Sequence, residues 1–355
     1  MIKRLRKVYM MFPAFLMKWE LVTYLFTIAG VCMLKMDAAF EEKIENAIQQ
    51  YYDLYKVRSI RLKLDIIRQY ISQGMEPSEH VAFELFFKNK SEKHEFISLN
   101  EMRMRYYGDK ANFFPRNKYE RYKMFQNFFK RQLICITFDG TSQEAELYAS
   151  FINKHDRFIV KPVNGAQGRA VQIVFSQEVP NLETLFERAG EACILEELIV
   201  QNEELAKFHP SSVNTVRVIS TMNKNEECTI LYSLFRCGIG NSVVDNTCAG
   251  GIASLIDVNK GIIKSNGFMG NKEIDCHPDT KEVFLGTCIP AWDEACKIAE
   301  KAHRMHPQQM LIGWDFAWTS EGWDLVEANP LPLMRTYQMI EKQGARPKLI
   351  KAGIL

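Results

Sequence analysis

The segment from residue 311 to residue 329, LIGWDFAWTSEGWDLVEAN, constrains this chain most, because it places acidic side chains inside two apolar, strand-like runs. The turn sequence Ser320-Glu321-Gly322 between the runs predicts a β-hairpin. Asp315 lies in the first run, and Glu327 and Asn329 lie in the second. Because side chains two residues apart on a strand share a face, we expect Glu327 and Asn329 to point the same way, with Asp315 beside them across the hairpin.

Two carboxylates and an amide oxygen on one face predict a site for a hard cation. Mg²⁺ in particular binds one or two carboxylates, keeps waters and takes further oxygens from nucleotide phosphates. The alternative is an edge hairpin whose acids face water. The metal site is favoured because the neighbours Trp314, Phe316 and Leu325 are apolar, and a buried acid must be paired or bind a metal. Removal of either acid is then expected to hold or raise the melting temperature.

The composition excludes several classes of protein. A chain of 355 residues with 47% hydrophobic and 25% charged residues is an ordinary soluble globular protein with room for two or three domains. A net charge of +2 and the absence of a stacking motif argue against nucleic acid as a partner. The nine cysteines include no C-x-x-C pair, which is typical of a reduced, cytoplasmic protein without a disulfide framework.

The N-terminus combines four basic side chains within its first seven residues with an apolar stretch. Pro13, Lys18 and Glu20 interrupt this stretch, and the run from Lys18 to Lys35 is shorter than the roughly 20 residues that a spanning helix needs. We therefore expect a helix that packs on the domain or lies at the inner face of a membrane, in preference to a helix that crosses it. The remaining residues to about position 110 predict helices, and no catalytic residue stands out among them.

From about residue 133 the pattern changes to alternating helices and strands. Residues 157–163 predict a strand that contains Lys161, and a small glycine loop with Gly165, Gln167 and Gly168 follows it. The loop lacks the Gly-Lys-Ser/Thr of a Walker motif, but glycines allow backbone N–H groups to approach phosphate oxygens. Most such loops are simple turns. Lys161 strengthens the phosphate interpretation, because a lysine inside an apolar strand needs an anionic partner.

Two further strands carry charged side chains. Residues 192–200 predict a buried strand that contains Glu196 and Glu197 and leads to the polar segment 201–204, which can offer groups to a base and to ribose hydroxyls. Solvated acids at a strand exit are the alternative. Arg217 lies between two valines in a strand predicted at 215–222, where a guanidinium is costly unless it faces an oxyanion. An arginine on an edge strand is the alternative here.

The order of these features resembles the ATP-grasp superfamily. The series is Lys161-Pro162 with a glycine loop, Glu196-Glu197, Asn214-Thr215-x-Arg217, and Asp315 followed by Glu327-x-Asn329. Individual sequence segments, such as ILEELIVQN, SVNTVRV and IGWDFA, resemble the sugar-transfer-associated ATP-grasp family, and the resemblance covers roughly residues 112–350. This resemblance implies an α+β fold in which two α+β subdomains enclose ATP. The catalytic domain would cover residues 111–355, preceded by an N-terminal helical region at 1–110.

The resemblance also implies roles in nucleotide binding. Lys161 would contact the α-phosphate and adenine region, and Gly165, Gln167 and Gly168 would form a flap over the β- and γ-phosphates. Lys118 would contact phosphate, although the customary aspartate before it is Asn117 here. The remaining nucleotide contacts implied are Glu196 and Glu197 at the hinge beside adenine and Glu204 on the ribose.

For the reaction, the resemblance implies ATP with Mg²⁺, or Mn²⁺ in its place, held by Asp315, Glu327 and Asn329. Arg217 would stabilise the phosphoryl group in transfer, and Lys161 would share that task. The chemistry implied is carboxylate–amine ligation through an acyl phosphate, on small, sugar-linked substrates of surface polysaccharide synthesis. Residues suggested for acceptor contacts are Asn246, Gly250, Gly251 and His277. A phosphotransferase and a non-catalytic nucleotide-binding module are the alternatives.

Overall fold

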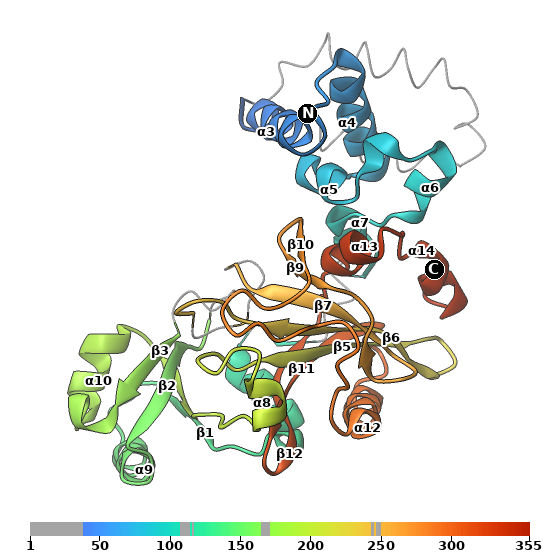
Figure 1. The fold of residues 1–355 in the computed structure, drawn as a ribbon. Coiled ribbons are helices and arrows are strands. Elements are labelled where there is room, and N and C mark those ends of the chain that lie inside the picture. The colour runs from blue at the N-terminus through green and yellow to red at the C-terminus, as the bar shows by residue number, and fades with distance from the viewer. Residues whose placement is uncertain (1–37, 107–113, 116, 165–170, 243–244, 246–249) are drawn as a thin grey trace. The chain divides into compact units, whose positions relative to one another are not determined.

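The computed structural model describes residues 38–106, 114–115, 117–164, 171–242, 245 and 250–355 (Figure 1). The described chain forms two compact units, one of residues 38–106 and 333–353 and the other of residues 114–332. The sequence pattern places residues 333–353 in the second domain, whereas the structure groups them with the N-terminal helices. The N-terminal stretch 1–37, for which membrane contact is expected, lies outside the described residues. None of the described helices is long and apolar enough to cross a membrane.

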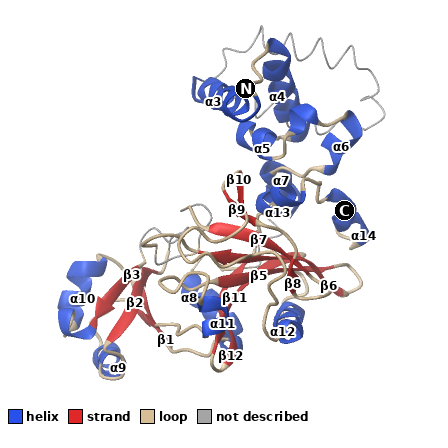
Figure 2. Ribbon diagram, viewed as in Figure 1, coloured by secondary structure: helices blue, strands red, loops and turns tan. Residues whose placement is uncertain are grey.

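The first unit is helical (Figure 2). Ser59 begins its second helix, because its Oγ accepts a hydrogen bond from the Leu62 backbone N–H at 3.2 Å, and Gly74 ends that helix in the left-handed conformation at φ 65°. The helices of this unit are α3 (Ala38–Tyr55), α4 (Ile60–Gln73), α5 (Pro77–Ala82), η2 (Leu85–Phe87), α6 (Lys90–Glu95), α7 (Leu99–Tyr106), α13 (Arg335–Glu341) and α14 (Arg346–Lys351).

Gln338 explains why the C-terminal helices belong to this unit. Its side chain is fully buried and forms hydrogen bonds with both backbone groups of Ile97, each at 2.9 Å. The side-chain oxygen of Gln338, Oε1, also accepts a hydrogen bond from the Ala345 backbone N–H at 3.0 Å. A buried amide that satisfies three backbone groups joins two segments 241 residues apart in the chain.

The second unit contains two antiparallel sheets. The smaller sheet has the order β1-β4-β2-β3, and α9 and α10 share one apolar core with it. Phe158 and Val160 of β2 belong to this core, so the alternation of side chains turns Lys161 to the opposite face of the sheet. The elements are β1 (Leu133–Ile136), α9 (Ser142–Ile152), β2 (Arg157–Pro162), β3 (Gln172–Phe175), η4 (Ser176–Glu178), α10 (Leu182–Ala189) and β4 (Cys193–Glu197).

The larger sheet has eight strands in the order β10-β9-β7-β6-β5-β11-β12, with β8 paired to β7. The predicted hairpin is confirmed as β11 (Leu311–Thr319) and β12 (Gly322–Asn329), which pair in antiparallel register. The helix α12 packs its alanines against Val218, Ile312 and Trp314 on one face of this sheet. The other elements are α8 (Lys118–Phe125), η3 (Gln126–Phe128), α11 (Glu203–Ala206), β5 (Thr215–Met222), β6 (Cys228–Cys237), β7 (Ile252–Asp257), β8 (Ile262–Ile263), β9 (Gly267–Met269), β10 (Lys272–Ile274) and α12 (Trp292–Arg304).

Candidate active site

A row of charged side chains crosses four neighbouring strands of the larger sheet. Arg217 on β5 is the register partner of Asp315 on β11, and Asp315 is the partner of Glu327 on β12. On the other side of β5, Thr215 is the partner of Arg236 on β6. Registered partners point to the same face, so these side chains form one row, which we call the charged row. The apolar residues between them, such as Trp314, face the core on the opposite side.

Asp315 lies at the centre of the charged row and is buried. Arg217 donates hydrogen bonds to both carboxylate oxygens of Asp315, from Nε to Oδ1 and from Nη2 to Oδ2, each at 2.6 Å. Arg236 Nη2 lies 3.1 Å from Oδ2, and Asn329 Nδ2 donates to the same oxygen at 3.2 Å. Burial alone would raise the pKa of Asp315, but the guanidinium groups of Arg217 and Arg236 hold that pKa below its usual value. Asp315 is therefore an ionised carboxylate at neutral pH.

Glu327 and Asn329 complete the predicted metal site at the acidic end of the charged row. The side chain of Glu327 is 43% exposed, and among the described residues it forms an ion pair with Arg121, whose Nη1 lies 3.9 Å from Oε1. No group of three or more His, Cys, Asp or Glu side chains is gathered as a metal site among the described residues. Two carboxylates and an amide oxygen nevertheless form a donor set that fits Mg²⁺. Arg217 binds both oxygens of Asp315, so this carboxylate would have to free one oxygen for a cation.

Two cations, Lys118 and Arg121, lie close to Glu327. Lys118 begins α8, where Asn117 acts as the cap by accepting from the Tyr119 N–H at 2.8 Å, as an aspartate would. Burial lowers the pKa of Lys118, and the charges of Lys161 and Arg121 add to this effect while Glu327 opposes it. Within the described structure, the buried Nε of Arg121 has no hydrogen-bond partner. Partly buried cations that leave a buried donor without a partner fit a polyphosphate.

Lys161 reaches a buried ion network that joins the two sheets. Its Nζ pairs with Glu196 of β4, whose carboxylate also pairs with Arg131. Arg131 in turn binds Asp324 of β12, with Nη1 2.9 Å from Oδ1. Burial would raise the pKa of Glu196, but Arg131 and Lys161 lower it to about 2. The Glu196 carboxylate is thus committed to Arg131 and Lys161 and is 3% exposed, which leaves only its backbone for a contact with adenine.

Several other predicted residues form hydrogen bonds with groups outside the charged row. Glu197 accepts from the Gln132 backbone N–H at 3.0 Å, and the exposed Glu204 accepts from Trp318 Nε1 at 2.7 Å. His277 is fully buried, with Nε2 donating to the Gly238 carbonyl at 2.9 Å and Nδ1 accepting from the Asp279 N–H at 3.2 Å. Neither ring nitrogen is left for a substrate. Gly250 has a positive φ of 93°, and Gly251 is buried.

Four predicted residues cannot be placed. Gly165, Gln167, Gly168 and Asn246 lie outside the described residues. Conversely, sequence reasoning missed Arg131, Arg121 and Arg236. Arg236 carried the same signal as Arg217, since it lies inside the apolar strand sequence LYSLFRC.

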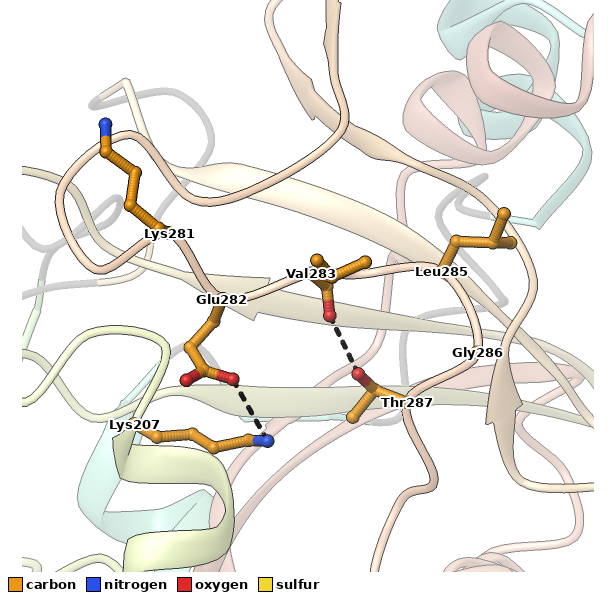
Figure 3. A pocket seen from close by; sticks show the side chains of 7 residues that line it. All are labelled: Lys207, Lys281, Glu282, Val283, Leu285, Gly286 and Thr287. Atoms are coloured by element: carbon orange, nitrogen blue, oxygen red, sulfur yellow. Dashed lines mark hydrogen bonds and ion pairs between the residues drawn. The ribbon is translucent and has the colours of Figure 1, made fainter.

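An open hollow of about 420 Å³ lies elsewhere on the second unit (Figure 3). Lys207 Nζ pairs with Glu282 Oε2 at 3.1 Å along its wall, and Thr287 Oγ1 donates to the Val283 carbonyl at 2.8 Å. The remaining lining residues are Lys281, Leu285 and Gly286. None of the predicted site residues that the structure describes lines this hollow, so it is not the candidate site.

Comparison with known proteins identifies the family. The family model described as sugar-transfer associated ATP-grasp matches residues 123–353. No curated protein matches the chain. N5-carboxyaminoimidazole synthetase from Staphylococcus aureus complexed with ADP is 14% identical with a TM-score of 0.41, over 70% of this chain and 54% of that chain. D-alanyl-alanine synthetase A from Vibrio cholerae is 13% identical with a TM-score of 0.38, over 67% of this chain and 60% of that chain.

The present chain thus spans only 54–60% of the length of these two solved structures, and similarity at this level carries no argument about activity. The family match, by contrast, covers well over half of the chain and includes the whole charged row. The expected α+β architecture, with helices ahead of an ATP-grasp domain, is confirmed. The chain belongs to the sugar-transfer-associated ATP-grasp family.

Proposed function

We propose that this chain is an ATP-dependent, ADP-forming ligase that activates a carboxylate as an acyl phosphate and joins it to an amine. The charged row is the observation that carries the proposal. It sets acidic side chains beside buried arginines on one face of a sheet whose other face is apolar. Such an arrangement suits a phosphoryl group that is neutralised by a cation on one side and by guanidinium groups on the other.

Each part of the site has a role in this proposal. Lys118, Arg121 and Lys161 neutralise the phosphates of ATP. Asp315, Glu327 and Asn329 would hold Mg²⁺, which when bound polarises phosphate oxygens. Arg217 stabilises the charge that spreads over the phosphoryl group during transfer. The glycine loop at 165–168 is proposed to exclude water that would hydrolyse an acyl phosphate.

The substrates are proposed to be a small carboxylate and an amine, one of them carried on a sugar-containing precursor of a surface polysaccharide. The family description supports the link to sugar transfer. A test incubates the protein with Mg·ATP, hydroxylamine and a panel of carboxylates, and measures ADP, phosphate and hydroxamate. Equal amounts of all three are expected, because hydroxylamine attacks an acyl phosphate. AMP and pyrophosphate would contradict the proposal, and a stable phosphorylated product would favour a phosphotransferase.

Arg121 provides a prediction about nucleotide binding. Methionine at this position is expected to raise the dissociation constant for Mg·ATP about tenfold, because the buried Nε of Arg121 has no hydrogen-bond partner in the described structure and is available to a phosphate. The melting temperature without nucleotide is expected to hold or rise, since the variant removes an uncompensated charge. Isothermal titration measures the affinity, and Lys123→Met, on the exposed side of the same helix, is the control. Equal affinities for both variants would remove Arg121 from the site.

The protein is proposed to act in the cytoplasm, with its N-terminal stretch in peripheral contact with the inner face of a membrane. The motive is a cluster of basic residues beside a short apolar run. High salt or carbonate is expected to release most of the protein from isolated membranes. A requirement for detergent would show instead that the stretch is inserted.

A further inference from the structure

Arg236 is a buried guanidinium on the charged row and has no role in the function proposed above. Arg236 is 7% exposed and lies on β6 between the fully buried Phe235 and Cys237. Nε and Nη2 donate to Thr215 Oγ1 at 3.1 and 2.7 Å. Nη2 also lies 3.1 Å from Asp315 Oδ2 and 3.4 Å from Asp245 Oδ2. Burying a guanidinium is costly, and the carboxylates of Asp315 and Asp245 offset part of that cost.

The order of the strands gives Arg236 a distinct place. The sheet runs β6-β5-β11-β12, so the row reads Arg236, Arg217, Asp315 and Glu327 from one end to the other. With neighbouring strands about 4.8 Å apart, the two ends of the row are separated by roughly 14 Å. Cation-binding oxygens lie at one end, and the two guanidinium groups lie toward the other. Both guanidinium groups reach Asp315, but Arg236 comes from the strand farther from Glu327. A phosphoryl group held beside Asp315 and Glu327 would therefore have the strand of Arg236 on its far side.

An acceptor carboxylate faces a problem that this order solves. It must approach the γ-phosphorus from the side opposite the departing ADP, although both groups are negatively charged. A buried cation beyond the phosphoryl group offsets that repulsion and can fix both carboxylate oxygens through its planar fork. Among the described residues of the row, Arg236 is the cation at that end.

We propose that Arg236 binds the carboxylate of the phosphoryl acceptor, while Arg217 binds the phosphoryl group itself; this inference rests on the proposed function. One carboxylate oxygen forms a bond to the γ-phosphorus. The bond from that phosphorus to the β,γ-bridging oxygen breaks, and its electron pair leaves with ADP. No proton moves in this step. Arg236 thus selects acceptors that carry a free carboxylate.

The competing explanation is that Arg236 only neutralises Asp315 and Asp245. A purely structural arginine would support the metal end through Asp315, so its loss would weaken Mg·ATP binding and carboxylate use together. An acceptor-binding arginine would separate them, because the Michaelis constant for the carboxylate would rise while nucleotide affinity stayed the same. The two explanations therefore differ in a measurable way.

The test compares Arg236→Gln and Arg236→Lys with the wild type. The probe is whichever of glycine, L-alanine, L-aspartate, L-glutamate, acetate and glucuronate gives the most hydroxamate with the wild-type protein. For Arg236→Gln we expect the Michaelis constant for that carboxylate to rise at least about tenfold, with the dissociation constant for Mg·ATP within about twofold of wild type. Arg236→Lys keeps the charge and loses the planar fork, so its Michaelis constant for the carboxylate is expected to lie between those of the wild type and Arg236→Gln.

Two comparison variants sharpen the result. Arg217→Lys is expected to lower kcat more than it raises the Michaelis constant for the carboxylate, since Arg217 acts on the phosphoryl group. Arg188→Gln, an exposed arginine on α10 paired with Glu178, is expected to change neither. An unchanged Michaelis constant for the carboxylate in Arg236→Gln would overturn the inference. A parallel loss of Mg·ATP affinity in this variant would also overturn it. A wild-type protein that binds Mg·ATP but forms no hydroxamate with any probe would contradict the proposed function, and the inference with it.

Discussion

Glutamine in place of Glu327 is expected to lower ATP turnover at least about a hundredfold, the scale of losing one preorganised electrostatic contact. The fold is expected to be unaffected, because this side chain is half-exposed and its nearest described cation is 3.9 Å away. Phosphate release measures turnover, and the melting temperature without nucleotide checks the fold. Glu321→Gln, in the exposed turn of the same hairpin, is the control and is expected to retain full turnover. Normal turnover in Glu327→Gln would remove this residue from the metal site.

Asp315→Asn is expected to lower turnover as much, but with a different effect on stability. The sequence alone predicts that removing either acid holds or raises the melting temperature. The structure corrects this for Asp315, which is buried and paired with the guanidinium groups of Arg217 and Arg236. Removing one partner of a buried pair leaves the other charges uncompensated, so the melting temperature of Asp315→Asn is expected to fall. Equal melting temperatures for Asp315→Asn and Glu327→Gln would contradict this account of the row.

Methionine in place of Arg131 is expected to lower the free energy of unfolding by about 3–5 kcal/mol, the usual cost of breaking a buried ion pair from one side. Arg131 is buried and pairs with both Glu196 and Asp324, so the variant leaves two buried carboxylates short of a partner. Denaturant unfolding measures the change. Arg304→Met is the control, because Arg304 forms an exposed pair with Glu300 that contributes little. Similar losses of unfolding free energy in Arg131→Met and Arg304→Met would show that the buried ion network does not hold the two sheets together.

The same variant has a signature in its pH dependence. The pKa of Glu196 is lowered from 4.5 to about 2, so the stability that this group provides is present above pH 4.5 and is lost as the pH falls toward 2. Without Arg131 the pKa of Glu196 is expected to rise toward its ordinary value. The unfolding free energy of Arg131→Met should therefore depend less on pH between about 4.5 and 2 than that of the wild type. An identical slope would assign the acid sensitivity to other groups.

Local patterns in the sequence predicted the strands that carry the centre of the candidate site. The alternation of Trp314, Asp315 and Phe316 indicates a strand with one charged face, and the structure confirms that strand and its hairpin. The valines that flank Arg217 likewise indicate a strand, and the structure confirms it as β5. What could not be predicted was the pairing of Asp315 with two arginines, because it depends on which strands become neighbours. A single sequence does not contain that register.

The other features of the fold and the site could not be predicted, because they depend on contacts between residues far apart in the chain. The attachment of residues 333–353 to the first unit depends on Gln338, a polar residue with no local motif, bound to the Ile97 backbone. Arg131 ends a basic, aromatic segment in which nothing distinguishes it from its neighbours, and its partners are 65 and 193 residues away. His277 resembled a polar loop residue, although burial commits both of its ring nitrogens to the backbone.

The most direct test of phosphoryl transfer to a carboxylate is the fate of the carboxylate oxygens. The acceptor carboxylate is labelled with ¹⁸O and incubated with the protein, Mg·ATP and hydroxylamine, and the released phosphate is analysed by mass spectrometry. If the acyl phosphate forms, nucleophilic attack at its carbonyl carbon breaks the bond to the labelled oxygen, and each phosphate released carries one ¹⁸O. Unlabelled phosphate, or ¹⁸O in AMP, would contradict the account.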